Sequence, residues 1–279
     1  MIRNTILLWL WQLLTVAAVP KQQIERNRSE NRRVLQAEVK IEPGRYIENQ
    51  PQLGRLKFGR GFDFAYGGCS VIAVYNTLLS LGEQVSGGTL CEIAEELQRR
   101  GVALGGKFGV APLSLKRYLE RYARKKGFTV KSTSSNRTAV LDALGAECDA
   151  VLVVLWNGKR LRDQFHAMHI EKRHNGFVLH NACYLIPNTD EMPDKKLPQH
   201  GNRRQNGPNG QNGPNGQNCP NGQNGLNGGS APNGESDKNG QSTEKKYGEK
   251  GPYGTVSEAV RGYAVNGVGV VLALGVKRQ

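Results

Sequence analysis

One stretch decides the helical half of the fold: residues 67–82, which read GGCSVIAVYNTLLSLG. Apolar residues occupy nearly every turn of a helix drawn through Cys69–Leu81, and this pattern is typical of a helix that is buried on all sides. Two glycines precede the helix, and Gly82 follows it and marks its end. The sequence therefore predicts a buried helix that begins at a cysteine.

Further elements are predicted after this helix. Thr89 and Glu92 have the spacing of a capping box for a helix over 90–100, and Pro112 opens a helix that ends at Lys126. The later elements are a strand at 128–132, a short helix at 137–144, a central strand at 150–156, a hairpin at 166–172 and 177–181, a helix capped at Thr255, and a last strand at 268–276. A helical first half packed on an antiparallel sheet is an α+β fold.

The composition shows that only part of the chain belongs to this domain. Of 279 residues only 38% are apolar, while 35 are glycine, and 14 of these glycines lie in residues 201–254. Such a segment buries too little apolar surface to offset its ordering entropy. Glycine recurs there at every third position, but with gaps and with asparagine instead of abundant proline, which excludes collagen. We expect residues 191–254 to be a disordered insertion before the last helix and strand, and residues 46–190 and 255–279 to form one domain.

The N-terminus carries an apolar run at residues 6–19 that ends at Pro20. Fourteen residues are few for a bilayer span, but a basic start and small residues at 16–18 are typical of a secretory signal. Residues 21–45 then read as a basic linker, and positive charge there favours retention in the cytoplasm. We expect residues 1–20 to be a signal or anchor on a membrane-associated or extracytoplasmic protein; the alternative is an amphiphilic helix on a cytoplasmic one.

Neither the net charge of +14 nor the five cysteines indicates a binding class by itself. Basic residues are densest at 99–126, but no nucleic-acid motif accompanies them, so a solvated helix face is the better explanation and nucleic-acid binding is unlikely on this pattern. The cysteines lack the spacing of a zinc site or of a disulfide framework. Cys91 and Cys148 are expected to be buried thiols.

Cys69 is the exception among the cysteines. A cysteine in the first turn of a helix lies beside backbone amides and the positive end of the helix dipole, and both favour the thiolate. Gly67 and Gly68 allow the backbone of a substrate to approach closely. Taken alone, however, Cys69 is better explained as a small residue packed at a helix start.

The predicted hairpin changes this balance because it brings a histidine and an asparagine onto neighbouring strands. His166 and His169 face opposite ways along one strand, so only one of them can meet Cys69. A four-residue connection puts Met168 opposite Asn181 and His166 beside it on the same face, whereas a three-residue connection would select His169. We favour His166 as the base, with His169 as the alternative. Nucleophile, base and orienter then follow the order Cys, His, Asn.

At this point the sequence resembles a known family. Tyr66-Gly67-Gly68-Cys69, the helix through 75–79 and the hairpin from His166 to Asn181 are similar to papain-like cysteine peptidases of the bacteriocin-processing type, in particular to a poorly characterised branch in Gram-positive bacteria. The resemblance covers about residues 58–181 and the last strand. It implies a papain-like fold, a peptide or protein substrate, and no metal or organic cofactor. It also implies that Cys69 attacks a carbonyl, His166 moves the proton and Asn181 holds the imidazole.

One position departs from that family. A glutamine usually stands six residues before the nucleophile and donates to the oxyanion, but here the position is Asp63. An ionised carboxylate would repel the oxyanion. Either Asp63 is protonated, or another donor such as the backbone amide of Cys69 acts, or the protein is weakly active or inactive. We therefore expect a thiol hydrolase, with an acyltransferase or amidase on the same triad, or an inactive peptide-binding module, as alternatives.

Overall fold

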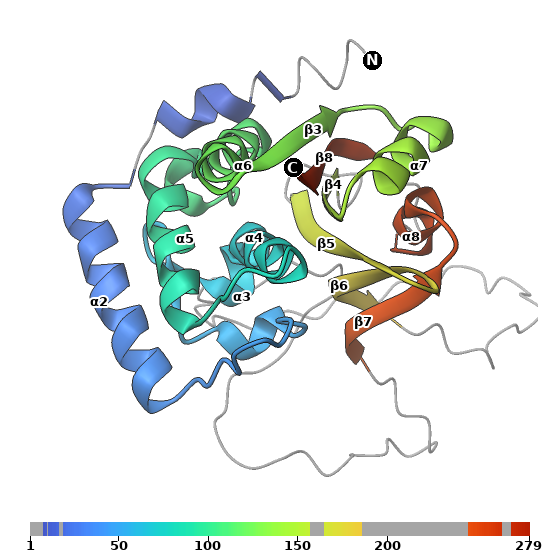
Figure 1. Cartoon of the computed structure of the whole chain (residues 1–279). Coiled ribbons are helices and arrows are strands. Elements are labelled where there is room, and N and C mark those ends of the chain that lie inside the picture. Colours follow the sequence, from blue (N-terminus) through green and yellow to red (C-terminus); the bar gives the residue numbers. More distant parts are fainter. Residues whose placement is uncertain (1–7, 10, 17–18, 157–164, 186–244, 264–268) are drawn as a thin grey trace, which may run out of the picture.

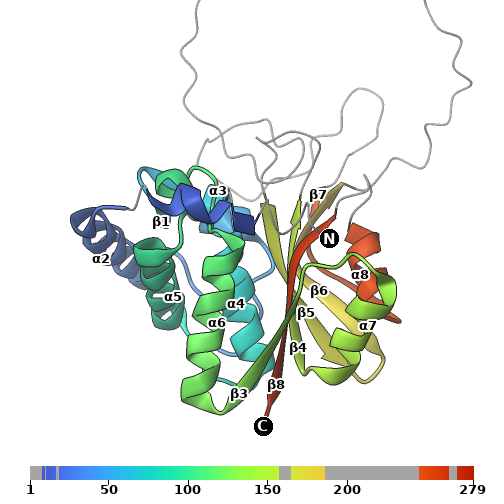
Figure 2. The same cartoon turned by 90° about the horizontal axis from the view of Figure 1, so that it is seen from above.

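The computed structural model describes residues 8–9, 11–16, 19–156, 165–185, 245–263 and 269–279 (Figure 1). It has a mixed α+β architecture, as the sequence predicts. One layer is helical and consists of α2 (Lys21–Ala37), α3 (Phe64–Gly67), α4 (Cys69–Ser80), α5 (Gly87–Arg100) and α6 (Pro112–Lys126). Figure 2 shows this layer on one face of a central sheet, with α7 (Thr138–Glu147) and α8 (Val256–Tyr263) on the other face.

The sheet has six antiparallel strands in the order β3-β8-β4-β5-β6-β7. Their bounds are β3 Phe128–Thr133, β4 Ala150–Trp156, β5 Phe165–Arg173, β6 Gly176–Leu185, β7 Lys245–Tyr253 and β8 Val270–Arg278. The short elements are the 3-10 helices η1 (Leu14–Val16), η2 (Gln50–Leu53) and η3 (Ala103–Gly106), and the ribbon of β1 (Lys57–Phe58) and β2 (Phe62–Asp63). The predicted hairpin, central strand and last strand are all present.

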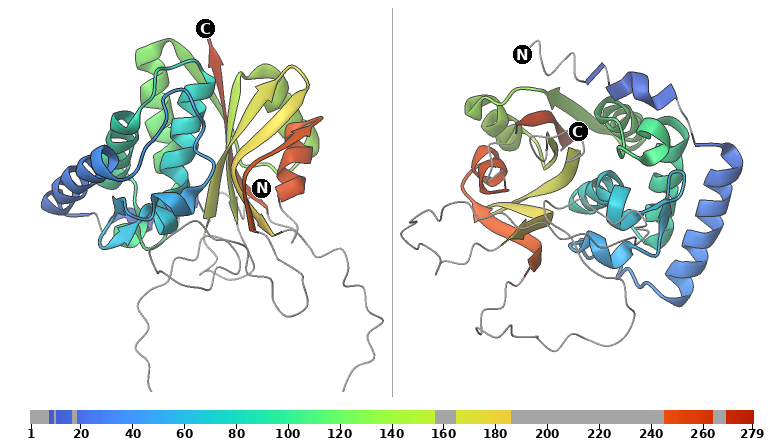
Figure 3. Two further views of the ribbon diagram at one scale, coloured as in Figure 1. Left: turned by 90° about the horizontal axis from the view of Figure 1, so that it is seen from below. Right: turned by 180° about the vertical axis from the view of Figure 1, so that it is seen from behind.

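Both faces of the sheet are covered, which explains the continuous apolar run of β4. Leu152 and Val154 pack in the core beneath the helical layer, while Val151, Val153 and Leu155 pack in the core beneath α7 and α8. A strand buried on both sides needs no polar alternation. The two views of Figure 3 show the sheet between these two helical layers.

The segment 21–45 differs from the expected linker because most of it is α2. Ile24, Asn27, Asn31 and Val34 recur at helical spacing and are buried. Asn27 donates to the Gly59 carbonyl at 2.9 Å, and the two buried asparagines hide the amphipathic pattern in the sequence. Hydrogen bonds from a polar helix face, together with two apolar side chains, attach α2 to the domain.

Two further expectations change in detail. The helix predicted from Leu90 begins at Gly87, because Ser86 is its N-cap and forms the capping box with Thr89. The strand β7 lies at the end of the expected insertion and pairs with β6, so the boundary at residue 254 is also different. The rest of that insertion, residues 191–244, lies outside the described residues.

Candidate functional site

Cys69 is the first residue of α4, as predicted, and it lies where the helical layer meets the start of β5. Its thiol donates to the Phe165 carbonyl at 4.0 Å, and the backbone amide of Ala167 points at the sulfur. The side chain is buried, and this burial raises the pKa of the Cys69 thiol despite the nearby amides. In this arrangement Cys69 is a neutral thiol at neutral pH.

Gly68 brings the turn between α3 and α4 close to Phe64. A Cβ at this position would lie 2.6 Å from the Phe64 carbonyl oxygen and 2.8 Å from its ring. The backbone angles of Gly68 are ordinary for any residue, so the requirement for glycine comes from space. Gly68 therefore permits the close turn between α3 and α4 that places Cys69 at the first position of α4.

His166 lies on β5 between the two residues that contact the Cys69 sulfur. Its Nε2 is 3.1 Å from the Asn181 carbonyl oxygen, and its ring stacks on Tyr263 at the end of α8, with the centroids 5.6 Å apart. Burial lowers the pKa of His166 to about 4, so the imidazole is neutral at neutral pH. Its buried Nδ1 has no hydrogen-bond partner among the described residues, and therefore no hydrogen bond joins it to Cys69.

The sequence suggested that the side-chain amide of Asn181 orients His166. In the structure, Asn181 contacts His166 through its backbone carbonyl instead. The backbone of Asn181 has φ of 58°, and the pairing register of β6 with β7 shifts around it. This left-handed residue breaks the alternation of β6. The side chain of Asn181 consequently turns to Gln50, which donates its backbone amide to Oδ1 at 3.2 Å and accepts from Nδ2 at 3.2 Å.

His169, the alternative base, does not lie beside Cys69. Its Nδ1 is 3.2 Å from the Thr77 hydroxyl oxygen. Thr77 is two turns along α4 from Cys69, a rise of about 12 Å. The β5–β6 pairing, with His169 opposite His180, corresponds to the four-residue connection that favours His166.

Asp63, at the glutamine position of the family, is the N-cap of α3. Its Oδ1 accepts from the Tyr66 amide at 2.8 Å. A carboxylate is a good acceptor at a helix N-terminus, so a structural role explains this residue.

The sequence did not reveal a charged cluster next to this site, formed by the buried His180 and the partly buried Glu48 and Glu171. His180 is fully buried, with an exposed fraction of 0%. Its Nδ1 lies 2.5 Å from a Glu48 oxygen and its Nε2 lies 3.0 Å from a Glu171 oxygen. The Tyr46 ring stacks on the imidazole with centroids 3.8 Å apart, and the Tyr46 hydroxyl donates to Glu171 at 2.9 Å.

This arrangement favours the positively charged form of His180. Burial opposes the charge, but the hydrogen bonds to Glu171 and Glu48 outweigh it and raise the pKa of His180. Burial likewise opposes the charge of Glu171, yet His180, Tyr46 and Arg173 lower its pKa to about 2. Glu48 also accepts a hydrogen bond from the backbone amide of Asn181 at 3.0 Å. The cluster therefore stabilises the left-handed backbone of Asn181, the residue that contacts His166.

The possible metal ligands of the described region overlap with this cluster. Ligand atoms of Glu48, His180 and Glu249 lie within 4.8 Å of one another. Both imidazole nitrogens already have carboxylate partners, and Glu249 pairs with Arg173 at 2.9 Å. Protons and an arginine therefore occupy the places that a metal ion would need.

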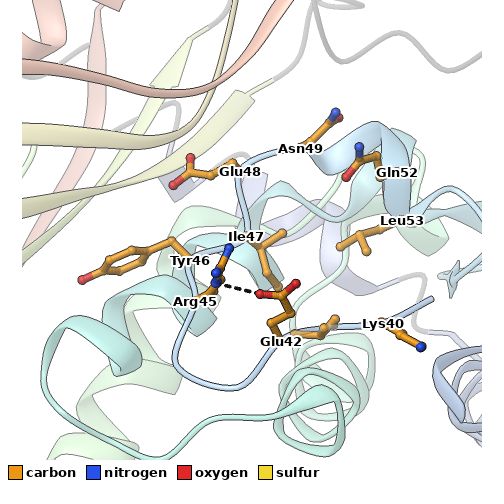
Figure 4. Close-up of a pocket in the computed structure, with 10 residues that line it drawn as sticks. Lys40, Glu42, Arg45, Tyr46, Ile47, Glu48, Asn49, Gln52 and Leu53 are labelled. Atoms are coloured by element: carbon orange, nitrogen blue, oxygen red, sulfur yellow. Dashed lines mark ion pairs between the residues drawn. The ribbon is translucent and has the colours of Figure 1, made fainter. Parts of the chain in front are cut away.

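A pocket of about 250 Å³ adjoins the cluster (Figure 4). The side chains of Tyr46 and Glu48 point from it toward the sheet, away from Lys40 and from the Glu42–Arg45 ion pair. The pocket is lined by residues of the segment 40–53, and neither Cys69 nor His166 is among them. It is therefore a neighbour of the candidate site and not its cleft.

Comparisons with protein-family models, with curated proteins and with solved structures found no match to this chain. Among the described residues, no helix has both the length and the hydrophobicity needed to cross a bilayer. Part of the apolar run at 6–19 packs against the domain, since Leu8, Trp11 and Val19 are buried.

Proposed function

We propose that this chain is a papain-like thiol hydrolase that acts on peptides, with Cys69 as the nucleophile and His166 as the base. The observation that carries the proposal is the buried Nδ1 of His166, which has no hydrogen-bond partner in the part of the chain that the structure describes. His166 is one residue away from both backbone groups that contact the Cys69 sulfur. Buried imidazole nitrogens without hydrogen-bond partners are uncommon. At functional sites such a nitrogen can form its hydrogen bond with the reacting group when the substrate binds.

The protonation states support general-base catalysis. Cys69 is a neutral thiol and His166 a neutral imidazole, because burial disfavours the charged form of each. When the Sγ–Nδ1 hydrogen bond forms, the proton passes from sulfur to Nδ1 as sulfur attacks the carbonyl carbon of the peptide. His166 then returns the proton to the leaving amine. Water hydrolyses the resulting thioester and regenerates the thiol.

Asn181 and Tyr263 hold the imidazole in this scheme. The Asn181 carbonyl fixes Nε2 as the protonated nitrogen and leaves the lone pair on Nδ1. Tyr263 stacks on the ring and restricts its rotation. Asp63 is bonded to the Tyr66 amide, so backbone amides in the first turn of α4 are the oxyanion donors in our scheme.

A second candidate is a peptide-binding module without hydrolysis. The observation that favours it is the missing hydrogen bond between Cys69 and His166, together with the raised pKa of the thiol. An acyltransferase would use the same residues and differ in the acceptor of the acyl group.

Alkylation of Cys69 tests the proposal. The rate of its reaction with iodoacetamide is measured by peptide mass spectrometry between pH 5 and pH 10. For a hydrolase, His166→Ala lowers the rate below pH 8 by about 10-fold or more, because the proton acceptor is lost. His169→Ala is the matched control and leaves the pH profile unchanged.

Two results separate the candidates. If wild type and His166→Ala have the same profile, with ordinary thiol behaviour, the hydrolase proposal is wrong and the binding module remains. New peptide termini in a mixture of unfolded proteins, absent with Cys69→Ala, identify hydrolysis directly. An amide formed with an added amine in place of a free carboxylate would identify a transferase.

A further inference from the structure

Four aromatic side chains from distant parts of the sequence meet at the end of the sheet where β4 stops and β5 starts. Trp11 lies at the centre, with ring centroids 4.5 Å from Phe165, 5.8 Å from Trp156 and 5.6 Å from Phe108. The exposed fraction of Trp11 is 4%. Phe108, Trp156 and Phe165, called here the aromatic pocket, thus receive a side chain of the N-terminal segment.

The residues of the aromatic pocket are connected to Cys69 and to the segment before it. The carbonyl of Phe165 accepts from the Cys69 thiol. The carbonyl of Lys107, next to Phe108, accepts from the Tyr66 hydroxyl at 2.9 Å, and Tyr66 stands three residues before Cys69. Two contacts therefore connect the pocket residues and their neighbours to Cys69 and to the short segment that leads into it.

The pocket does not satisfy the hydrogen-bonding group of Trp11. Its indole Nε1 is buried and has no hydrogen-bond partner among the described residues. An unpaired buried donor costs about 1–3 kcal/mol, and buried tryptophans usually find an acceptor. A ligand with the same ring but a better-placed donor, or with no donor, avoids this cost.

The rest of the N-terminal segment is weakly held. Trp9 and Leu13, one turn apart, are exposed by 58% and 65%. The Ser114 hydroxyl donates to the Gln12 side-chain oxygen at 3.1 Å and connects this segment to α6. The segment is apolar on both faces but buries only one, so its docking gains less than that of an ordinary core helix.

We propose that the aromatic pocket is a binding subsite for a bulky aromatic side chain of a peptide, and that Trp11 occupies it in cis. This inference deepens the proposed function by giving the substrate class, peptides with an aromatic residue beside the reacting bond. Binding itself does not depend on catalysis by Cys69. A peptide must displace the chain's own N-terminal segment. The larger the fraction of molecules in which Trp11 occupies the pocket, the lower the apparent affinity of the protein for the peptide.

The test measures the binding of a fluorescent peptide that carries residues 8–12 with two lysines added at each end. Fluorescence anisotropy with the full chain gives the dissociation constant. Trp11→Ala, which empties the pocket, is expected to bind at least about 10-fold more tightly than wild type. Trp9→Ala, a matched change of an exposed tryptophan in the same segment, is expected to bind like wild type. Adding Phe108→Ala to Trp11→Ala should abolish the gain.

Hydrogen exchange of the wild type gives a second readout that needs no core substitution. Saturating peptide should speed amide exchange in residues 11–16, because the segment leaves the pocket. No gain in Trp11→Ala, or exchange that the peptide leaves unchanged, overturns the proposal. Release of the segment by anionic lipid vesicles but not by the peptide assigns it to a membrane and also overturns it. Peptide binding retained in Cys69→Ser supports this inference independently of catalysis. If, in addition, the alkylation of Cys69 in the otherwise wild-type chain does not depend on His166, the hydrolase is rejected and this inference stands.

Discussion

Position 181 decides how the candidate site is assembled. A regular strand would turn Asn181 away from His180, but φ of 58° turns both side chains toward the segment of Glu48 and Gln50. A left-handed asparagine costs about 1 kcal/mol or more and persists only where neighbours impose it. Glu48 is such a neighbour, since it binds the Asn181 amide and the His180 imidazole with its two oxygens.

We expect His180 to contribute much of the stability of this arrangement. His180→Gln removes the buried cation between Glu48 and Glu171 and leaves two carboxylates facing each other. Breaking such a buried pair should lower the free energy of unfolding by roughly 3 kcal/mol at pH 6. His174→Gln, in the exposed turn of the same hairpin, should change it by less than about 0.5 kcal/mol. Urea unfolding of both variants measures this, and equal stabilities would mean that the cluster contributes little.

At the scale of elements, α3 positions the entry into α4. This helix has four residues, too few to be stable alone, and it is capped by Asp63. Gly68 follows directly, so α3 and α4 form one bent unit that presents Cys69.

Asp63 is therefore predicted to matter for stability through its acceptor and not through its charge. Asp63→Asn retains a side-chain oxygen for the Tyr66 amide and should leave the midpoint of thermal unfolding nearly unchanged. Asp63→Ala should lower the free energy of unfolding by about 1 kcal/mol. If Asn destabilises the protein as much as Ala does, the charge of Asp63 is the important property and the cap is not.

At the scale of the whole molecule, the charged cluster joins the two halves. Glu48 and Tyr46 belong to the segment that follows α2, whereas His180, Glu171 and Arg173 belong to the sheet. Titration of its histidine should therefore affect the global free energy of unfolding.

Two pH limbs are expected. The raised pKa of His180 gives stability that is present below about pH 6.5 and is lost as the pH rises through the folded value. The lowered pKa of His166, about 4, gives the opposite sign: stability present above about pH 6.5 is lost as the pH falls toward 4. Urea unfolding from pH 4 to 9 should show both limbs. His180→Gln should flatten the alkaline limb. His166→Gln should reduce the acid limb without abolishing it, because burial also lowers the pKa of His169. Unchanged limbs would contradict these assignments.

Much of this protein could be predicted from its pattern of residues. The buried helix from Cys69, the helix from Pro112 and the strand at 150–156 follow from apolar periodicity and from end signals such as Gly127, which has φ of 74°. The helix α2 could not be found in this way, because two of its four buried positions are asparagines. Their hydrogen bonds exist only once the β1 ribbon and α5 are in place.

The features of the candidate site can be separated in the same way, into those that local sequence determines and those that tertiary contacts determine. The sequence by itself determined that Cys69 begins a helix and that His166 lies on a hairpin with Asn181, because local periodicity and turn chemistry act over a few residues. Only the tertiary structure decided that Asn181 meets His166 through its carbonyl, that His180 is buried between two carboxylates, and that Trp11 lies in the aromatic pocket beside Cys69. Each of these depends on partners far away in the chain, so burial and hydrogen bonding across the fold, and not local preference, fix them.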